Sequence, residues 1–455
     1  MTASAHAAPA GSPYHVLHRK LDSLEATIAV VGLGYVGLPL VRAIHDAGYR
    51  VLGFDIDQAK IDKLRRAECY IEHLGPEFFK ELAASSRFEP TSDAANLAKA
   101  DAILLCVPTP LGKHREPDLS YVIESTRLCA ATLRAGQLIV LESTTYPGTT
   151  REDMLPVLAE AGGTRGVVCG RDYFVAYSPE REDPGSPGRT AKELPKVVGG
   201  TDQPSGDLAA LLYGKFVRTV VRVSSAEVAE ASKLLENIYR AVNIALVNEM
   251  KVVLDAMGID VWEVIAAAST KPFGFQPFYP GPGLGGHCIP IDPFYLTWKA
   301  RAAGHNTRFI ELAGEINSAM PHHVIDRVAA ALNDDGKAMR GARVLVMGIA
   351  YKKNVDDIRE SPSAEIIELL RDRGAQVSYH DPHLPVFPSM RKHRIDLESA
   401  PLTPALAAGH DVALIVTDHD AVDYAVLAQH SPLVVDTRNA MARLAGKPRA
   451  RIVKA

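Results

Sequence analysis

A glycine-rich segment in the second half of the chain carries a cysteine and, four positions later, an aspartate. The segment reads Gly-Pro-Gly-Leu-Gly-Gly-His-Cys-Ile-Pro-Ile-Asp over residues 281–292 and contains Cys288 and Asp292. A cysteine thiolate beside an electron acceptor can hold an aldehyde as a covalent adduct until a second oxidation occurs. Combined with a bound dinucleotide, these residue types would indicate the oxidation of an alcohol, through an aldehyde, to an acid.

Cys288 differs from the other cysteines in its surroundings. The chain has five cysteines, at positions 69, 106, 129, 169 and 288. They lack Cys-x-x-Cys pairs and a histidine spacing suited to zinc, so no metal site is expected, and we interpret them as free thiols in a reducing cytosol. A small buried hydrophobic residue is the alternative for each. Only Cys288 lies in a glycine-rich loop, where the backbone can approach a ligand.

A second glycine pattern near the start of the chain indicates a dinucleotide. Gly-Leu-Gly-Tyr-Val-Gly at residues 32–37 follows an apolar run and opens a helical stretch. Gly32 permits the tight turn, Gly34 lets a pyrophosphate approach the backbone, and Gly37 allows the helix to pack closely on the strand. Asp55 ends the next strand, where a carboxylate accepts a hydrogen bond from a ribose 2′-hydroxyl and repels a 2′-phosphate. The pattern predicts NAD; a turn that needs glycine only for packing is the alternative.

Three turn-like stretches follow further strands of the same predicted sheet. They cover residues 107–110 with Thr109, residues 142–148 with Thr144, and residues 177–185 with Glu180 and Arg181. Ligands of an open parallel sheet gather at such strand ends, although Pro and Thr also occur there for structural reasons. Packed charges in the third stretch are compatible with a solvated loop. A carboxylate close to a substrate carbon and a water molecule would, however, suit a general base.

One long helix is predicted over residues 224–257, with apolar residues at three- and four-residue steps. Glu230, Lys233, Asn237 and Arg240 fall in one sector roughly opposite the apolar stripe. The periodicity alone favours an exposed amphipathic helix. The residue types favour a binding face, because an amide between two cations is well suited to gripping a hydroxyl and an oxyanion.

The alternation of apolar runs and helical stretches predicts an α/β fold. We expect two Rossmann-like, doubly wound parallel-sheet domains joined by a central helical segment. The expected division is a disordered tail over residues 1–24, an NAD-binding domain over 25–222, a helical segment with the cysteine loop over 223–325 and a second Rossmann-like domain over 326–455. A net charge of -4 gives no basic surface for nucleic acid, and no apolar run suits a membrane span.

Taken together, the motifs between about Ile28 and Arg438 resemble the UDP-glucose/GDP-mannose dehydrogenase family, the nucleotide-sugar 6-dehydrogenases. The resemblance implies an N-terminal domain for NAD, a central dimerisation segment, and a C-terminal domain for the UDP moiety of the substrate. It implies a homodimer formed through the long helix. It also implies that a sugar C6 alcohol is oxidised to a carboxylate with two NAD per turnover.

The resemblance also implies roles for single residues. Cys288 is expected to be the nucleophile, Lys233 and Asn237 the oxyanion-stabilising pair, Asp292 and Thr144 the holders of a water molecule, and Glu180 the base for thioester hydrolysis. The expected NAD contacts are Gly32, Gly34, Tyr35, Val36, Gly37, Asp55, Thr109, Thr144 and Arg359. The expected substrate contacts are Glu180, Arg181, Lys233, Asn237, Arg240, Gly283, Gly285, Lys352 and Arg438. The last of these stands in Asp-Thr-Arg, where the family often has Asp-Gly-Arg.

Two stretches bear on the substrate. Ser-Pro-Glu-Arg-Glu-Asp-Pro-Gly and the cysteine segment with its continuation Pro-Phe-Tyr-Leu are most similar to bacterial UDP-N-acetylglucosamine 6-dehydrogenases of surface-polysaccharide pathways; UDP-glucose enzymes usually have Pro-Glu-Phe-Leu. An acetamido group needs a hydrogen-bond donor, which Arg181 or Arg240 could provide. UDP-glucose, UDP-N-acetylgalactosamine and UDP-N-acetylmannosamine stay open as substrates. Two further functions stay open as well, a two-electron hydroxy-acid dehydrogenase and a non-catalytic nucleotide-sugar sensor.

Overall fold

The computed structural model describes residues 11–71, 74–112, 116–181, 193–286, 289–390 and 393–455. The chain forms two compact units, Met1–Leu235 and Glu236–Ala455. Each unit contains an α/β sheet of Rossmann type, so the expected fold class is confirmed.

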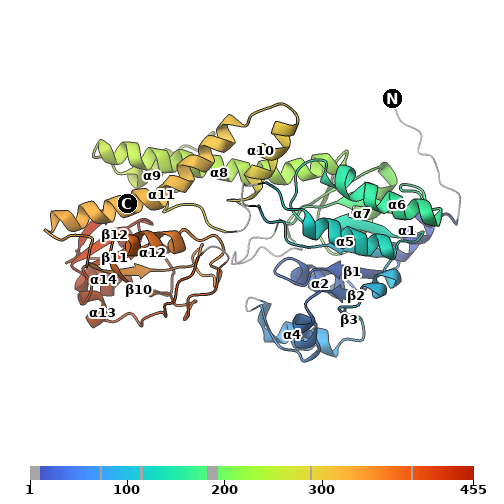
Figure 1. The fold of residues 1–455 in the computed structure, drawn as a ribbon, viewed down its shortest axis with the longest axis horizontal. Helices are drawn as coiled ribbons and strands as arrows, with labels where there is room; N and C mark the ends of the chain where they lie inside the picture. Colours follow the sequence, from blue (N-terminus) through green and yellow to red (C-terminus); the bar gives the residue numbers. More distant parts are fainter. Residues whose placement is uncertain (1–10, 72–73, 113–115, 182–192, 287–288, 391–392) are drawn as a thin grey trace. The chain divides into compact units, whose positions relative to one another are not determined.

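The first unit is built on an eight-stranded sheet with the order β3-β2-β1-β4-β5-β6-β7-β8. Figure 1 labels its strands β1, β2 and β3 together with helix α2. All neighbouring strands are parallel except β6 and β7, which are antiparallel. Starting 3-2-1-4-5-6, the order is that of dinucleotide-binding sheets. The strands are β1 Thr27–Val31, β2 Arg50–Phe54, β3 Phe88–Thr91, β4 Ala102–Leu105, β5 Leu138–Leu141, β6 Phe174–Tyr177, β7 Lys196–Gly200 and β8 Val220–Arg222. The α-helices are α1 Pro13–Asp22, α2 Gly37–Asp46, α3 Gln58–Arg65, α4 Gly75–Ala84, α5 Ser120–Ala131, α6 Leu155–Arg165 and α7 Gln203–Tyr213.

Alternate residues of these strands belong to two separate apolar cores. Ile28 and Val30 of β1 lie in one cluster of buried side chains, whereas Ala29 and Val31 lie in the other. Successive side chains of a strand point to opposite faces, so both faces of the sheet are covered. A sheet covered on both faces explains why its strands appear in the sequence as continuous apolar runs.

The segment before β1 is partly helical. Helix α1 begins after Ser12, whose hydroxyl accepts a hydrogen bond from the backbone N–H of His15. Leu17 and Leu21, one turn apart, are buried in the first core, and α1 packs against α7. The expectation of a disordered tail through residue 24 is therefore wrong for Pro13–Asp22; residues 1–10 lie outside the described part of the chain.

The second unit contains a five-stranded, fully parallel sheet with the order β10-β9-β11-β12-β13. Its strands are β9 Arg343–Met347, β10 Gln376–His380, β11 Val412–Ile415, β12 Leu433–Asp436 and β13 Arg451–Lys454. Its α-helices beyond the shared α8 are α9 Val261–Ala268, α10 Asp292–Ala302, α11 Arg308–Asp334, α12 Pro362–Asp372, α13 Pro404–Ala408 and α14 Tyr424–His430. Ser361 caps α12 through the N–H of Ser363, and Gly374 follows with a left-handed φ of 85°.

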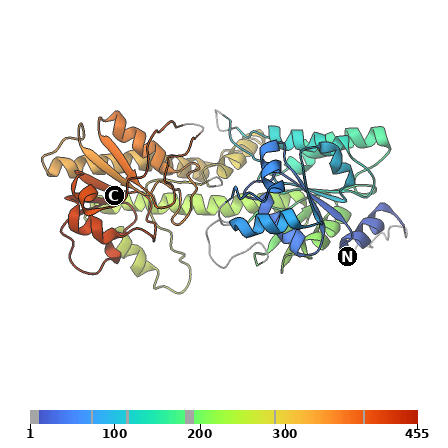
Figure 2. The ribbon, with the colours of Figure 1, turned by 90° about the horizontal axis from the view of Figure 1, so that it is seen from below.

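Helix α8, Ala226–Ala256, is a single helix of 31 residues (Figure 2). It ends just before Gly258, whose φ of 73° is a typical helix-stop conformation. The division between the two units falls inside α8, and α11 runs unbroken past residue 325, where the sequence predicts a domain boundary. The three-domain division therefore stays a prediction. Within the described ranges, no helix combines the length and apolar character needed to cross a bilayer.

Candidate active site

The glycine turn after β1 has the geometry that a bound dinucleotide requires. Gly32 has a φ of 94°, and a Cβ placed on it would lie 2.4 Å from the carbonyl oxygen of Cys106. A Cβ on Gly37 would lie 1.8 Å from the carbonyl oxygen of Gly32, so the helix packs directly on the turn. A Cβ on Gly34 would meet nothing within 4 Å. The first and third glycines are thus needed for packing, while the second faces the open space that a pyrophosphate needs.

Asp55, directly after β2, lies beside this turn. Its Oδ2 accepts hydrogen bonds from the Leu33 N–H at 2.9 Å and from the Lys60 Nζ at 3.0 Å, and its Oδ1 accepts one from the Asp57 N–H at 3.0 Å. An ionised carboxylate has about four lone-pair positions, so these three donors leave one acceptor position. The site therefore fits the ribose of NAD.

Thr109 and Thr144, two further predicted contacts of NAD, lie in the turns after β4 and β5. Hydrogen bonds of Ser143 connect these two turns. Ser143 Oγ accepts a hydrogen bond from the Val107 N–H at 3.0 Å and donates one to the Val107 carbonyl oxygen at 2.7 Å. Thr109 is buried, and Thr144 is half-buried. The structure thus brings together the two turns that contain them, at the carboxyl edge of the sheet, whereas their contacts with NAD stay predictions. Tyr35 is partly exposed on the glycine turn.

A buried glutamate on α8 holds the turn after β5 in place. The Glu230 carboxylate accepts hydrogen bonds from the Gly148 N–H at 2.6 Å, the Thr150 N–H at 2.9 Å and the Thr150 hydroxyl at 2.6 Å. Burial raises the pKa of Glu230 to about 7, although these hydrogen bonds oppose the shift. Glu230 therefore links the long helix of the site to the turn that contains Thr144.

The polar sector of α8 is the buried side of the helix. Glu230, Lys233 and Asn237 are all buried, whereas Leu235 and Leu246 of the apolar stripe are 67% and 53% exposed. The exposed amphipathic helix that periodicity alone favours is therefore wrong. The residue types were the better guide, because buried polar side chains need partners and so point to a built site.

Asn237 and Asp292 are hydrogen-bonded to each other within the second unit. The Asn237 side-chain N–H donates to Asp292 Oδ2, and the Arg240 guanidinium donates to Asn237 Oδ1. Asp292 is the first residue of α10 and is buried. This chain of contacts fixes the amide orientation and leaves one N–H of Asn237 for another acceptor. Lys233, also buried, lies one helical turn before Asn237 on the same side of α8.

The cysteine loop is described up to Gly286, and His287 and Cys288 lie outside the described residues. Asn248 on α8 accepts a hydrogen bond from the Gly281 N–H at 3.0 Å, and the Gly286 N–H donates to the Arg359 carbonyl oxygen at 3.0 Å. Both ends of the described glycine stretch are thereby fixed. The position of the nucleophile itself stays a prediction.

Two glycines of this loop pack against protein. A Cβ on Gly285 would lie 2.6 Å from the Tyr351 Cβ, and Gly283, with a φ of 136°, lies close to Pro362 and Pro321. Packing explains why these positions need glycine, so their contacts with substrate stay predictions. The Arg438 guanidinium lies directly against Gly281, and its Nε donates to the Val416 carbonyl oxygen. The Asp-Thr-Arg segment and the start of the cysteine loop therefore meet.

Two other predicted ligand contacts of the second unit lie in the segment between β9 and α12. The Arg359 guanidinium donates both to Asp357 Oδ1 and to Asp357 Oδ2, and Lys352 is half-buried. The role of Arg359 at NAD and that of Lys352 at the UDP-sugar stay predictions.

Three other cysteines are poor nucleophiles. Burial raises the pKa of Cys129 to about 12 and that of Cys169 to about 11, and it also raises the pKa of Cys106 well above its ordinary value. A thiol with such a pKa is almost entirely protonated at neutral pH. Cys129 is buried and Cys106 and Cys169 are half-buried, whereas Cys69 lies exposed in the loop after α3.

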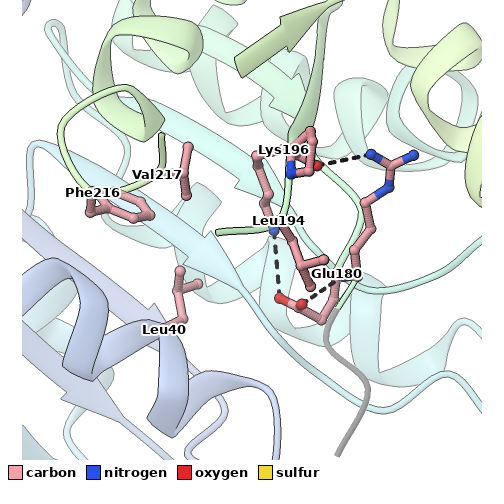
Figure 3. A pocket seen from close by; sticks show the side chains of 8 residues that line it. Leu40, Glu180, Leu194, Lys196, Phe216 and Val217 are labelled. Atoms are coloured by element: carbon pink, nitrogen blue, oxygen red, sulfur yellow. Dashed lines mark hydrogen bonds and ion pairs between the residues drawn. The ribbon is translucent and has the colours of Figure 1, made fainter. Parts of the chain in front are cut away.

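Glu180 follows β6 and lies at a pocket. A second polar side chain of this pocket, that of Lys196, was not predicted from the sequence. The pocket is lined by Glu180, Lys196 and Arg181 together with the apolar side chains of Leu40, Leu194, Pro195, Phe216 and Val217 (Figure 3). Lys196 Nζ lies 3.5 Å from Glu180 Oε2, and the Arg181 guanidinium donates to the Pro195 carbonyl oxygen at 2.8 Å. Lys196 also pairs with Glu142, which is 54 residues away in the sequence. No local pattern signals such a pair.

Comparison with known proteins places the whole described site in one family. Models of the UDP-glucose/GDP-mannose dehydrogenase family match residues 26–217 as the NAD-binding domain, residues 227–319 as the central domain and residues 345–443 as the UDP-binding domain.

Individual relatives agree with this family. The chain is 39% identical to the protein CapL of Staphylococcus aureus, with 79% of this chain and 82% of that protein covered. It is 36% identical to the UDP-N-acetyl-D-glucosamine 6-dehydrogenase of Pseudomonas aeruginosa, with 82% and 86% covered. Its fold matches the solved structure of a UDP-D-ManNAc dehydrogenase from Pyrococcus horikoshii with a TM-score of 0.82 at 30% identity, covering 94% and 98% of the two chains.

Proposed function

The chain belongs to the UDP-glucose/GDP-mannose dehydrogenase family, and on this basis we propose that it oxidises the C6 hydroxyl of UDP-N-acetyl-D-glucosamine to a carboxylate. The family assigns a nucleotide-sugar dehydrogenase with an NAD-binding domain. The proposed pathway is the formation of a sugar precursor for a surface polysaccharide.

The buried polar side of α8 is the observation that carries the proposal. A helix that turns Lys233 and Asn237 inward, with an aspartate bonded to the amide, has donors ready for an oxygen that gains negative charge. A sensor that only bound the nucleotide would not need this arrangement. The glycine loop that leads to Cys288 is fixed to the same helix through Asn248.

In the proposed mechanism the reacting groups belong to the chain. Asp292 and Thr144 hold a water molecule through which the C6 hydroxyl loses its proton, and an aldehyde results. The Cys288 sulfur then forms a bond to the aldehyde carbon, while Lys233 and Asn237 stabilise the oxyanion. NAD bound at the glycine turn beside Asp55 would supply the oxidising power, one NAD molecule for each of the two hydrides lost, so that the thiohemiacetal on Cys288 becomes a thioester. Water finally releases the acid, with Glu180 as the base.

The acetyl group of the substrate is the finer part of the proposal. Arg181 and Arg240 are the candidate donors, and the Pseudomonas relative is named for UDP-N-acetyl-D-glucosamine. The Pyrococcus structure is named for the ManNAc sugar, so the two relatives differ at the stereochemistry of the sugar. Kinetics with UDP-N-acetylglucosamine, UDP-N-acetylmannosamine, UDP-N-acetylgalactosamine and UDP-glucose decide between them. We expect the highest kcat/KM with the first; a higher value with any of the others would contradict the proposed substrate.

The exposed apolar stripe of α8 supports a homodimer formed through this helix. Leu235 and Leu246 of α8, and Met257 directly after it, are each more than half exposed, whereas Glu230, Lys233 and Asn237 of the same helix are buried. A second copy of the chain would cover them. Leu246→Lys should shift the mass in solution from twice 49.1 kDa towards 49.1 kDa. Glu249→Lys, at another exposed position of α8, is the control. A wild-type chain that is monomeric in light scattering would remove the dimer from the proposal.

A cytoplasmic location is also proposed. It is supported by Cys69, Cys106, Cys129 and Cys169, which are free thiols rather than members of disulfides. Finding a disulfide in the protein isolated from its source cells would argue against this location.

A further inference from the structure

Lys196, a buried lysine that pairs with Glu180, has no role in the proposed mechanism. Lys196 is the first residue of β7, and its side chain is 9% exposed. Its Nζ lies 2.5 Å from Glu142 Oε2. It also lies 3.5 Å from Glu180 Oε2 (Figure 3). The Glu142 side chain is fully buried, and the Tyr213 hydroxyl donates to its other oxygen. One cation therefore lies between two carboxylates, of which Glu142 is enclosed in the core and Glu180 faces a pocket.

Stability alone gives no reason for this cluster. Removing two charges from water is costly, and well-packed apolar side chains in place of a buried ion pair often leave a protein equally or more stable. Lys196 and Glu142 compensate each other, whereas Glu180, at 18% side-chain exposure, adds a further negative charge. A cluster with one carboxylate in excess is suited to controlling the proton affinity of the carboxylate that reaches the pocket.

We propose that Lys196 and Glu142 are positioning residues that aim the Glu180 carboxylate and set its proton affinity for the hydrolysis of the thioester. The inference rests on the proposed function, which gives Glu180 the role of base. Lys196 attracts the carboxylate and holds it ionised. Glu142 takes the closer contact with the cation, so Lys196 does not lower the proton affinity of Glu180 so far that the carboxylate can no longer accept a proton from water.

The step that depends on this balance is a simple hydrolysis. The oxygen of a water molecule forms a bond to the thioester carbon, and Glu180 takes the proton that the water loses. The carbon–sulfur bond breaks, and its electron pair leaves on the Cys288 sulfur. No oxidant or reductant is needed, so the Glu180 proton affinity directly controls this step.

The titration of the surrounding groups supports a charged Lys196. Burial lowers the pKa of Lys196, but the carboxylates of Glu142 and Glu180 raise it by more, so it is raised overall. Burial raises the pKa of Glu142, and the Lys196 cation opposes this. Burial also raises the pKa values of the Cys106 thiol and the Tyr213 hydroxyl, which are therefore neutral at ordinary pH. Among the described residues, Lys196 from β7, Glu142 after β5 and Cys106 after β4 interact electrostatically with Glu180, and the Arg181 backbone N–H donates to Glu180 Oε1.

The pocket in front of the cluster has room for a water molecule. Its volume is about 20 Å³, enough for roughly one water molecule. Phe216, Val217 and Leu40 form its apolar wall, and Glu180 and Lys196 form its polar wall (Figure 3). An apolar wall strengthens the interaction between the cation and the carboxylate, because it excludes bulk water.

The test is the pH dependence of acid formation in two variants that should act in opposite directions. The quantity compared is the apparent pKa of the acidic limb, which is the fall in rate at low pH as the base becomes protonated. Lys196→Met removes the cation and leaves the Glu142 anion, so the apparent pKa of the acidic limb should rise by about 1–3 units. Glu142→Gln leaves the cation to Glu180 alone, so the same limb should move to lower pH. A merely structural effect would lower the rate without moving the limb in opposite directions.

Two further variants serve as controls. Lys196→Arg keeps the cation and should restore the limb close to its wild-type position. Lys215→Met removes a lysine of the same unit that pairs with Asp22 on the surface, and it should leave the limb unmoved. If Lys196→Met does not fold, Glu142→Gln and Lys196→Arg are compared with the wild type. The acidic limb should move to lower pH in Glu142→Gln and should keep its position in Lys196→Arg.

Glu180→Gln separates the failure of this inference from the failure of the proposed function. If that variant keeps the acidic limb, Glu180 is not the base and the proposed mechanism is wrong at this residue. If the limb disappears in Glu180→Gln, but Lys196→Met and Glu142→Gln leave it in place or shift it in the same direction, the inference is overturned while the proposed role of Glu180 stands.

Discussion

The two sheets of this protein contain the same turn after their first central strand. Gly32 follows β1 and Gly348 follows β9, with φ values of 94° and 74°. Each donates its N–H to the last residue of the neighbouring strand at 2.8 Å. A Cβ on Gly32 would meet the Cys106 carbonyl oxygen at 2.4 Å, and one on Gly348 would meet that of Thr417 at 2.2 Å. The first glycine is thus a requirement of the strand-to-helix crossing, whether or not a ligand binds there.

The sheets differ at the aspartate that follows the next strand. Asp55 accepts three hydrogen bonds and keeps one acceptor position. Asp381 is fully enclosed, and its carboxylate contacts five donors, namely the backbone N–H groups of Ile349, Ala350, His383 and Leu384 and the Nε2 of His419. An aspartate at this place can bind a ribose only if the protein leaves part of it unoccupied. The first sheet is therefore suited to NAD, and the second is closed at the corresponding position.

The largest expected effect is the loss of stability in Asp381→Asn. The new amide would direct an N–H at donors that now contact a carboxylate oxygen, so the unfolding free energy should fall by about 3–5 kcal/mol. Asp55→Asn is the matched variant and should lose much less, because Asp55 has fewer donors. Denaturant unfolding followed by far-UV circular dichroism measures both. Equal losses in the two variants would contradict the difference drawn between the two sheets.

Opposite pH dependences are the next effect. Burial raises the pKa of Asp381, but the hydrogen bond and charge of His419 and the backbone donors lower it by more, so the net shift is downward. Its stabilising contribution is present above the ordinary value of 3.8 and is lost as the pH falls. Glu230 in the first unit has a pKa raised from 4.5 to about 7. Between these values the folded state holds a proton that the unfolded state has lost, so stability falls as the pH rises.

The Glu230 contribution can be measured by itself. At about 1.4 kcal/mol per pKa unit, the unfolding free energy of the wild type should fall by roughly 3 kcal/mol between about pH 4.5 and 7 through this group. In Glu230→Gln this part of the slope should be absent, although the amide lacks one acceptor and is less stable at every pH. An unchanged slope in the variant would mean that Glu230 is ionised throughout.

Binding of NAD gives the third contrast. Asp55→Asn loses a charged acceptor for the ribose, which should raise the KM for NAD about 10- to 100-fold. Asp381→Asn, where it folds, should leave this KM unchanged. Initial rates at varied NAD and saturating UDP-sugar test the pair. An increase in KM for both variants would show that the second sheet also contributes to the cofactor site.

The smallest effect concerns the glycines. A Cβ on Gly34 meets nothing in the protein, so Gly34→Ala should unfold like the wild type but raise the KM for NAD about 10-fold, because the methyl group occupies the path of the pyrophosphate. Gly348→Ala should destabilise the protein without changing that KM, because its φ and its contact with Thr417 exclude a side chain. A thermal shift and NAD kinetics on both variants separate the two roles of glycine.

Much of this architecture follows from local signals in the sequence. The glycine turn and Asp55 predict the unit formed by β1, the turn, α2 and β2. Ser361 and Pro362 indicate the start of α12. Such signals can be found in the sequence because caps and turns depend on neighbouring residues. Helix α1 escaped prediction although Tyr14, Leu17, Leu21 and Leu24 recur at the three- and four-residue steps of a helix. Composition alone made that segment resemble a disordered tail.

The site was less predictable than the fold. Periodicity divides α8 into two sides but does not say which side is buried, and here the polar side is. The Glu142–Lys196 pair joins the residue after β5 to the first residue of β7, so its existence depends on the strand order and not on any spacing in the sequence. Glu142 could have been noticed as a charged residue directly after a buried strand. Its partner could not.

The central claim is that one active site oxidises the substrate twice before releasing it. The most direct measurement is the number of NADH molecules formed for each UDP-N-acetylglucosamine consumed by the purified protein, with excess NAD. The account predicts two NADH and a uronic acid as the product. One NADH per sugar, with an aldehyde as the final product, would contradict it.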